Sequence, residues 1–539
     1  LNSSNIAPIS IITILLLFTA VHQFIIEYIL LHNPRIPLVH AKVIGNHFLI
    51  QLGLFIVTTN LLQSYALFIN GTLRVVGVVV LIYIINAEGN PAFKMTWMLC
   101  VMAFPAVGTL FYIYVKSQVG VRWMGKRLAT LKIETDPYMM QDMDVVDALR
   151  ASKPANANLA YYLAHHMGFP TYRNTEVTYF PLGEDKFDAL VPELKKARKY
   201  IFMEYFIVEK GYMWDTILKI LVQKAREGVE VRFMYDGTCA ISNLPYEYPQ
   251  ELERKGIRCK MMNPIRPFLS TVQNNRDHRK ICVIDGRVGF TGGINLGDEY
   301  INRKERFGHW KDTAVMLKGD AVQSLTMLFL QMWNVDEKEE EHYTRYLTPR
   351  RQGLRRELGY VLPYGDSPFD NENVGEEVYF HILNHAKKYV HIMTPYLILD
   401  NEMITTLTRT AKSGIEVIII MPHIPDKWYA FVVAKTYYKE LIEGGVQIYE
   451  YRPGFVHAKV FVSDDDTATV GTINLDYRSL YLHFECGTFI YNNSEIDRIE
   501  RDFQHTLTKC HKVTLLEVKN RTILTKVSGQ VLRLLAPLM

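Results

Sequence analysis

The chain has 539 residues, too many for one typical hydrophobic core, and its 60 Lys and Arg against 56 Asp and Glu give a formal net charge of +4. Such a balance does not suggest a nucleic-acid-binding protein, in which basic residues are expected to gather on one face. The charge is also unevenly distributed, because residues 1 to about 115 carry few charged side chains.

Residues 1–118 form an apolar region in which three stretches are long enough to cross a bilayer. These are Ile9–Leu31, His47–Ile69 and Thr96–Val115. A fourth run, Leu73–Ile85, is shorter, and Arg74 interrupts its start. We therefore predict three or four transmembrane helices. His22 and Glu27 are costly in lipid, so an interfacial or helix-packed first segment stays open.

Basic residues follow directly after the last apolar stretch, at Lys116, Arg122, Lys126, Arg127 and Lys132. This placement favours the cytoplasmic leaflet, so we expect a multi-pass protein of the cell membrane with its remainder in the cytoplasm. A cleaved signal peptide is disfavoured because the start has no basic region. The six cysteines show neither CxxC pairs nor Cys/His zinc spacing, which favours a reducing compartment and predicts no metal.

The remainder contains a duplicated pattern of strand-like and helix-like segments. In the first copy these are residues 201–206, 214–228 and 229–235, and in the second copy residues 386–393, 403–414 and 415–421. The alternation predicts an α/β fold with largely buried strands. We divide the region into a linker at 119–168, one lobe at 169–345, a second lobe at 346–516 and an amphipathic tail at 517–539. The tail either lies on a membrane surface or packs on the second lobe.

Each copy ends in a motif with the same spacing of polar residues and glycine. The motifs consist of His278, Lys280, Asp285, Gly292 and Asn295, and of His457, Lys459, Asp464, Gly471 and Asn474. A histidine and a lysine two residues apart on a strand point to the same face. Two matches in one register make a chance arrangement improbable, so we predict one site built from both motifs.

These residue types suit the transfer of a phosphodiester without a metal. Lys280, Lys459, Asn295 and Asn474 would stabilise charge on the phosphoryl oxygens. One imidazole would attack phosphorus, and the other would protonate the departing alkoxide. Asp312 and Glu485 occupy comparable places after the two motifs and are candidates for orienting the histidines, as in a catalytic triad. Asp285 and Asp464 are grouped with the catalytic residues as members of the motifs, although we expect them to brace the local turn or pair with a base.

The duplicated HxKxxxxD pattern resembles the phospholipase D superfamily over roughly residues 165–515. That resemblance implies two α/β lobes in a pseudo-twofold arrangement, a covalent phosphohistidine and no cofactor. Further segments are similar to cardiolipin synthases in particular: Asn90–Trp97, Met203–Phe206, Thr291–Tyr300, Asn474–Ser479 and Leu534–Met539. The chain departs mildly from the superfamily at Gly293 and Thr472, where serine is common.

The resemblance implies transfer of a phosphatidyl group between two phosphatidylglycerol molecules, which yields cardiolipin and glycerol. By family analogy His278 would be the nucleophile and His457 the acid and base. The expected partners are phosphatidylglycerol and membrane lipids, with no nucleic acid. A phospholipase D-type hydrolase, a nuclease and an inactive membrane scaffold remain as alternatives, and the sequence makes no prediction of oligomeric state.

Overall fold

The computed structural model describes residues 66–117, 119–264, 274–339, 341–348 and 359–538. The chain divides into two compact units, one of residues 1–119 and 266–271, the other of residues 120–265 and 272–539. The predicted segment Ile9–Leu31 and most of His47–Ile69 lie outside the described residues.

The described part of the first unit contains three helices, α3 (Ala66–Asn86), α4 (Pro91–Ala103) and α5 (Pro105–Lys116). The stretch Thr96–Val115, which we expected to be long enough to cross a bilayer, is divided between two helices, α4 and α5. Phe104, at φ −133° and ψ 71°, separates them. Proline lacks an N–H and disfavours helical geometry in the residue before it, so Pro105 begins a new helix. Among the described residues we find no helix that combines the length and the apolarity needed to cross a membrane.

The segment predicted as a linker is mostly helical and, from Gly120 onward, is part of the second unit. It contains α6 (Val119–Thr135), η3 (Asp136–Tyr138), α7 (Met143–Ser152), α8 (Pro154–Tyr161) and the π-helical turn η4 (Tyr162–His166). Met124, Leu131 and Met139 are buried in the same hydrophobic core as both sheets. These residues therefore belong to the folded unit.

The first lobe is built on a seven-stranded sheet in the order β1-β8-β6-β5-β2-β3-β4. Its strands are β1 (Thr175–Phe180), β2 (Tyr200–Tyr205), β3 (Glu230–Asp236), β4 (Arg258–Met262), β5 (Ile281–Ile284), β6 (Val288–Gly292) and β8 (Ala314–Gly319). Its helices are α9 (Gly183–Lys196), α10 (Tyr212–Arg226), α11 (Cys239–Ser242), α12 (Tyr248–Glu253), η6 (Asp298–Ile301), α13 (Val322–Trp333) and η7 (Tyr343–Tyr346). Alternate residues of β2 face opposite cores: Ile201 and Met203 pack with α9 and α10, and Phe202 packs with α13.

The second lobe has an eight-stranded sheet in the order β19-β13-β12-β10-β15-β16-β18-β9. Its strands are β9 (Tyr360–Asp366), β10 (Tyr389–Met393), β12 (Glu416–Pro422), β13 (Gln447–Tyr451), β15 (Val460–Ser463), β16 (Thr467–Gly471), β18 (Glu485–Tyr491) and β19 (Cys510–Lys512). Its helices are α14 (Val374–His385), α15 (Asn401–Lys412), α16 (Trp428–Glu443), α17 (Tyr477–Tyr481) and α18 (Glu495–Leu507). The run β18-β16-β15-β10-β12-β13 repeats β8-β6-β5-β2-β3-β4 of the first lobe. The predicted α/β fold with two similar lobes is confirmed.

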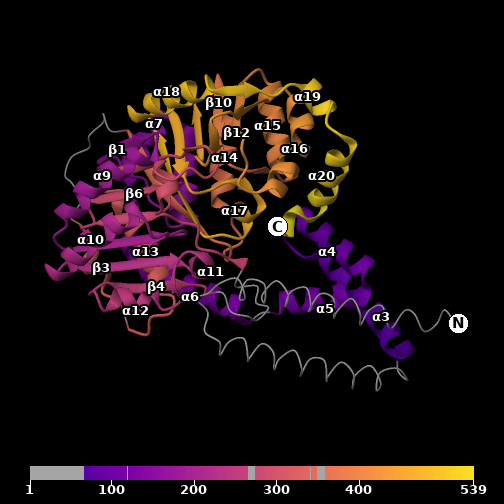
Figure 1. Ribbon diagram of the computed structural model, residues 1–539, viewed down its shortest axis with the longest axis horizontal. Helices are drawn as coiled ribbons and strands as arrows, with labels where there is room; N and C mark the ends of the chain where they lie inside the picture. Colours follow the sequence, from indigo (N-terminus) through magenta and orange to yellow (C-terminus); the bar gives the residue numbers. More distant parts are fainter. Residues whose placement is uncertain (1–65, 118, 265–273, 340, 349–358, 539) are drawn as a thin grey trace. The chain divides into compact units, whose positions relative to one another are not determined.

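The two lobes lie side by side (Figure 1). They share one hydrophobic core and are joined by backbone pairing. In the core, Phe202 and Ile281 of the first lobe belong to the same cluster as Val460 and Val470 of the second. Strand β7 (His309–Lys311) pairs in parallel with β14 (Gly454–Val456), and an isolated bridge joins Asp277 to Phe484. Within the second lobe, β11 (Leu397–Ile398) pairs with β17 (Leu475–Asp476).

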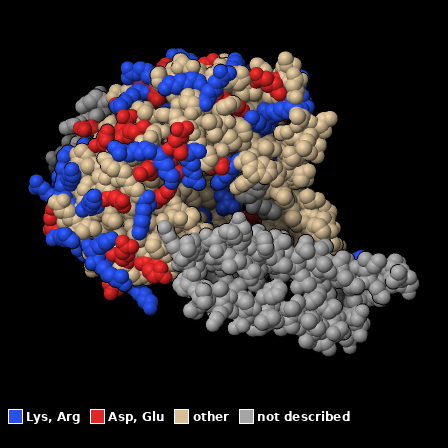
Figure 2. Space-filling model, viewed as in Figure 1, with Lys and Arg blue, Asp and Glu red and all other residues tan. Residues whose placement is uncertain are grey.

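The tail forms α19 (Leu515–Lys519), α20 (Ile523–Leu535) and η9 (Ala536–Leu538). Of the two alternatives for this tail, the structure shows packing on the second lobe, since the Arg533 guanidinium lies 4.0 Å from the centre of the Tyr437 ring on α16. On the face shown in Figure 2, Lys and Arg are interspersed with Asp and Glu over the described surface. This mixture agrees with the small net charge.

A buried ion cluster next to the first motif provides a test of lobe stability. Arg279 lies 2.6 Å from Glu204 and 3.2 Å from Asp277, and each of the three side chains is at most 4% exposed. We expect Arg279→Met to lower the free energy of unfolding by about 3–5 kcal/mol, because it leaves buried carboxylates without a cation. Denaturant unfolding measures the change. The double variant Arg279→Met, Glu204→Gln should recover part of it, and equal losses would contradict the assignment.

Candidate active site

Each motif histidine is fixed by a backbone hydrogen bond to the other lobe. The His278 N–H donates to the Phe484 carbonyl over 2.9 Å, and the His457 N–H donates to the Lys311 carbonyl over 2.7 Å. Both histidines lie just before the strand that continues their motif, β5 or β15. The apolar residues of these strands are fully buried, which holds the extended segments in place.

The residue after each of these carbonyls carries a carboxylate that contacts the ring. Glu485 places both oxygens 2.9 Å from His278 Nδ1, and Asp312 places Oδ2 2.7 Å from His457 Nδ1. The two candidates thus hydrogen-bond the imidazoles, and both do so across the boundary between lobes. An Nδ1–H donated to a carboxylate leaves Nε2 with its lone pair free for chemistry.

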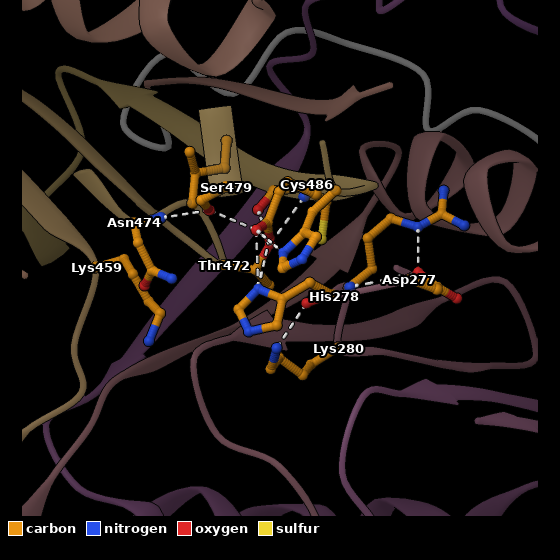
Figure 3. A network of polar contacts seen from close by, with 12 residues as sticks. Asp277, His278, Lys280, Lys459, Thr472, Asn474, Ser479 and Cys486 are labelled. Atoms are coloured by element: carbon orange, nitrogen blue, oxygen red, sulfur yellow. Dashed lines mark hydrogen bonds and ion pairs between the residues drawn. The ribbon is translucent and has the colours of Figure 1, made fainter. Parts of the chain in front are cut away.

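The two motif lysines are almost completely buried beside the histidines. Lys280 Nζ donates to the His278 carbonyl over 2.6 Å, and Lys459 Nζ donates to the His457 carbonyl. Burial lowers the pKa of Lys280 to about 8 and the pKa of Lys459 to about 7. Figure 3 shows both lysine side chains extending into the neighbourhood of the His278 ring. A cation held this far from water is available to a bound anion.

The same surroundings keep both imidazoles neutral. Burial, followed by the charge of Lys459, lowers the pKa of His457 to about 4. Burial and the charge of Lys280 hold the pKa of His278 well below its usual value. An anion bound between the lysines would offset their charge and raise both imidazole pKa values. Binding of such an anion would therefore favour uptake of a proton by the site.

The two motif asparagines line the cavity between the lobes and keep part of their amide groups unused. Asn295 Oδ1 accepts a hydrogen bond from the Ile207 N–H over 3.0 Å, while its Nδ2 is buried with no partner among the described residues. Asn474 Oδ1 is likewise buried with no partner in the described part of the chain. Buried polar atoms are normally paired, so these amides are suited to a ligand.

Asp285 and Asp464 do not line this cavity. Asp285 accepts hydrogen bonds from the backbone N–H groups of residues 198, 199 and 200, and Asp464 from those of residues 387, 388 and 389. Both have φ 54°, a left-handed conformation. They brace the turns that lead into β2 and β10. The contacts of these two motif aspartates are therefore structural, in agreement with the expected bracing role.

The cavity has a volume of about 680 Å³ and is lined by both motif histidines. Phe206 lies against His278 at a ring-centre distance of 4.8 Å, and Trp310 lies against His457 at 5.3 Å. Five basic residues outside the two motifs also line it: Arg276, Arg306, Lys427, Arg478 and His483. His483 stands two residues before Glu485, and this spacing is the sequence feature that could have identified it as a site residue.

One group of side chains in the described structure has the composition of a metal site. Ligand atoms of His278, His483 and Glu485 lie within 4.8 Å of one another. Glu485 already accepts hydrogen bonds from Thr472 and Ser479 as well as His278. A divalent cation here would displace these contacts and meet the charges of the nearby lysines. The arrangement suits an anion better, and the prediction that no metal is needed stays a prediction.

Comparisons with known proteins extend over most of the chain. A family model described as "Cardiolipin synthase, PLD-like domain" matches residues 190–333 and 379–507. An uncharacterized protein of Streptococcus mutans is 50% identical and covers 85% of this chain and 99% of its own. The cardiolipin synthase of Alkalihalophilus pseudofirmus is 34% identical and covers 87% and 93%. A phosphatidylserine synthase of Haemophilus influenzae has 15% identity and a TM-score of 0.56, covering 72% of this chain and 100% of its own, which shows the fold alone.

The structural role of Asp285 can be tested by stability. We expect Asp285→Ala to lower the free energy of unfolding by about 2 kcal/mol, because backbone N–H groups lose a charged acceptor. Asp285→Asn is the matched control, since asparagine keeps one oxygen and tolerates a left-handed φ. The free energy of unfolding of Asp285→Asn, measured by denaturant titration, should fall by less than half as much. A large loss of turnover with unchanged stability would instead place Asp285 in the chemistry.

Proposed function

The chain belongs to the cardiolipin synthase family of PLD-like proteins and is a phosphatidyltransferase, and we propose that it joins two phosphatidylglycerol molecules into cardiolipin and glycerol. One observation carries this proposal: His278 and His457, each held at Nδ1 by a carboxylate of the other lobe, line a single cavity. Such a pair supplies one nucleophile and one proton carrier for the same phosphorus atom.

In the first step, His278 Nε2 attacks the phosphorus of one phosphatidylglycerol. A P–N bond forms as the P–O bond to glycerol breaks, and protonated His457 gives its proton to the leaving oxygen. Lys280 and Lys459 stabilise the charge that develops on the phosphoryl oxygens. Burial lowers the pKa of both histidines, so the assignment of His278 as nucleophile and His457 as proton carrier follows the family analogy.

In the second step, the terminal hydroxyl of another phosphatidylglycerol replaces the glycerol. Neutral His457 takes the proton of this hydroxyl, whose oxygen attacks the phosphohistidine. The new P–O bond forms as the P–N bond breaks, so His278 returns to its neutral state and cardiolipin leaves. Glu485 stabilises the charge on His278 while the intermediate exists, as the carboxylate of a triad does for its imidazole.

We also propose that the enzyme works at the cytoplasmic face of the cell membrane, with residues 1–118 as its anchor. The apolar composition of this region and the basic residues that follow it support the proposal. Exposed apolar side chains on α3, among them Val75, Val78 and Val79, support it too. Both proposed substrates are lipids that stay in the bilayer.

The reaction is tested by following labelled phosphatidylglycerol. We expect cardiolipin and glycerol from the native enzyme, and a loss of turnover of about 10³-fold or more for His278→Ala and for His457→Ala. His165→Ala, which changes an exposed histidine outside the cavity, is the control and should keep native turnover. Phosphatidic acid and glycerol as the only products would identify a hydrolase. Native turnover in His278→Ala would exclude this mechanism.

The lysine pKa values predict the pH dependence of kcat/KM, which reports the free enzyme. Burial lowers the pKa of Lys459 to about 7 and the pKa of Lys280 to about 8, so the ammonium forms that bind phosphate are lost as pH rises through this range. We therefore expect kcat/KM to fall between about pH 7 and 8. The fall in kcat should come at higher pH, because a bound anion raises both lysine pKa values. A kcat/KM that stays constant to pH 10 would contradict the role of these lysines.

A further inference from the structure

The cavity holds a second group of basic side chains beside the two motifs. This group consists of Arg276, Arg478 and His483, and we call it the second basic cluster. Arg276 and His483 are buried at 5% and 8% exposure, and Arg478 is half-buried. None of the three belongs to either motif, and the proposed chemistry uses none of them.

His483 is the most informative member of the second basic cluster. Neither of its ring nitrogens has a hydrogen-bond partner among the described residues. Its Nδ1 lies 3.6 Å from Glu485 Oε1, too far for a good hydrogen bond. Leaving a buried polar group unpaired costs about 1–3 kcal/mol, so a ligand that pairs with this ring is expected.

Several cationic side chains act on His483. Arg478, Lys427 and Arg276 all act on His483, whose pKa is lowered first by burial and then by these cations and Lys280. Arg276 and Arg478 also repel each other, which helps burial to lower the pKa of Arg276. Asp236, 3.6 Å from Arg276, offsets part of this charge. Like charges held around an unpaired imidazole form a surface that an anion would stabilise.

The acidic residues of the cavity offset part of this charge. Glu299 pairs with Arg306 at 3.0 Å, and Asp426 accepts from the Tyr396 hydroxyl. Asp476 accepts from the Ser479 N–H at the start of α17 and also acts on Arg478 and Lys427. None of these carboxylates hydrogen-bonds His483 among the described residues. The second basic cluster lies beside the reacting histidine, since the rings of His483 and His278 are 5.4 Å apart between centres.

We propose that Arg276, Arg478 and His483 form a second anion subsite, which binds the unreacted phosphate of an anionic acceptor lipid. The proposal rests on the function proposed above. Joining two phosphatidylglycerol molecules brings two phosphodiesters into one cavity, separated in the product by a three-carbon glycerol bridge. The motif lysines and asparagines hold the reacting phosphate, and the neighbouring cluster holds the other. An enzyme that uses water or a neutral alcohol needs only one such subsite.

Acceptor choice gives the test, because donor chemistry can be measured in the same sample. Cardiolipin formation uses a lipid acceptor, whereas incorporation of labelled glycerol into phosphatidylglycerol uses a small neutral acceptor. We expect Arg478→Gln and His483→Asn each to lower the ratio of the first rate to the second by about tenfold, the effect of about 1.4 kcal/mol. Arg306→Gln, which removes a cavity cation already paired with Glu299, is the matched control and should keep the native ratio.

Several outcomes would overturn the subsite. The subsite is rejected if the ratio of cardiolipin formation to glycerol incorporation is unchanged in both variants. It is also rejected if both rates fall equally, or if Arg306→Gln lowers the ratio as much. Far-UV circular dichroism shows whether the variants remain folded. Titration calorimetry with glycerol phosphate, a mimic of the acceptor headgroup, is independent of turnover: about tenfold weaker binding to Arg478→Gln is expected, and equal binding rejects the subsite. If the enzyme forms no cardiolipin but the binding difference remains, the proposed reaction is rejected and the subsite is retained.

Discussion

The site depends on a reciprocal exchange between the two lobes. Each lobe contributes a histidine, and each supplies the carboxylate that orients the histidine of the other: Glu485 for His278 and Asp312 for His457. In both cases the residue just before the carboxylate accepts the histidine N–H through its carbonyl. Two consecutive residues thus fix both the backbone and the ring, so that docking of the lobes and assembly of the site are one event.

Burial makes the site favourable for an anion. Lys280 and Lys459 lie among side chains that exclude water, and this environment penalises their charge. The nearby imidazoles cannot offset the positive charge, because they carry no negative charge and their protonation is also unfavourable in this environment. In the proposed reaction a phosphodiester would bring the missing negative charge and accept from the lysines and from Asn295 Nδ2. Binding and activation of the substrate therefore share one electrostatic cause.

Sequence reasoning predicted the parts of the site that follow a repeated register. His278 and His457 stood out because their whole motif occurs twice, and Asp312 and Glu485 because they follow at comparable places. The crossing of these carboxylates between lobes could not be predicted, because it depends on contacts between residues far apart in the chain. Arg276 and Arg478 belong to no repeat, so only the shared cavity brings them together with the motifs.

Helices are harder to predict where one local residue overrides an apolar run, and Pro105 divides a stretch that hydropathy alone treats as continuous. The segment before the first lobe shows the opposite effect. We predicted residues 119–168 as a linker, yet Leu131 is fully buried in the core of the second unit. For protein engineering this sets the boundary of the catalytic fragment. A fragment that begins at residue 169 would expose apolar core surface to water, whereas a fragment that retains α6 keeps this surface covered.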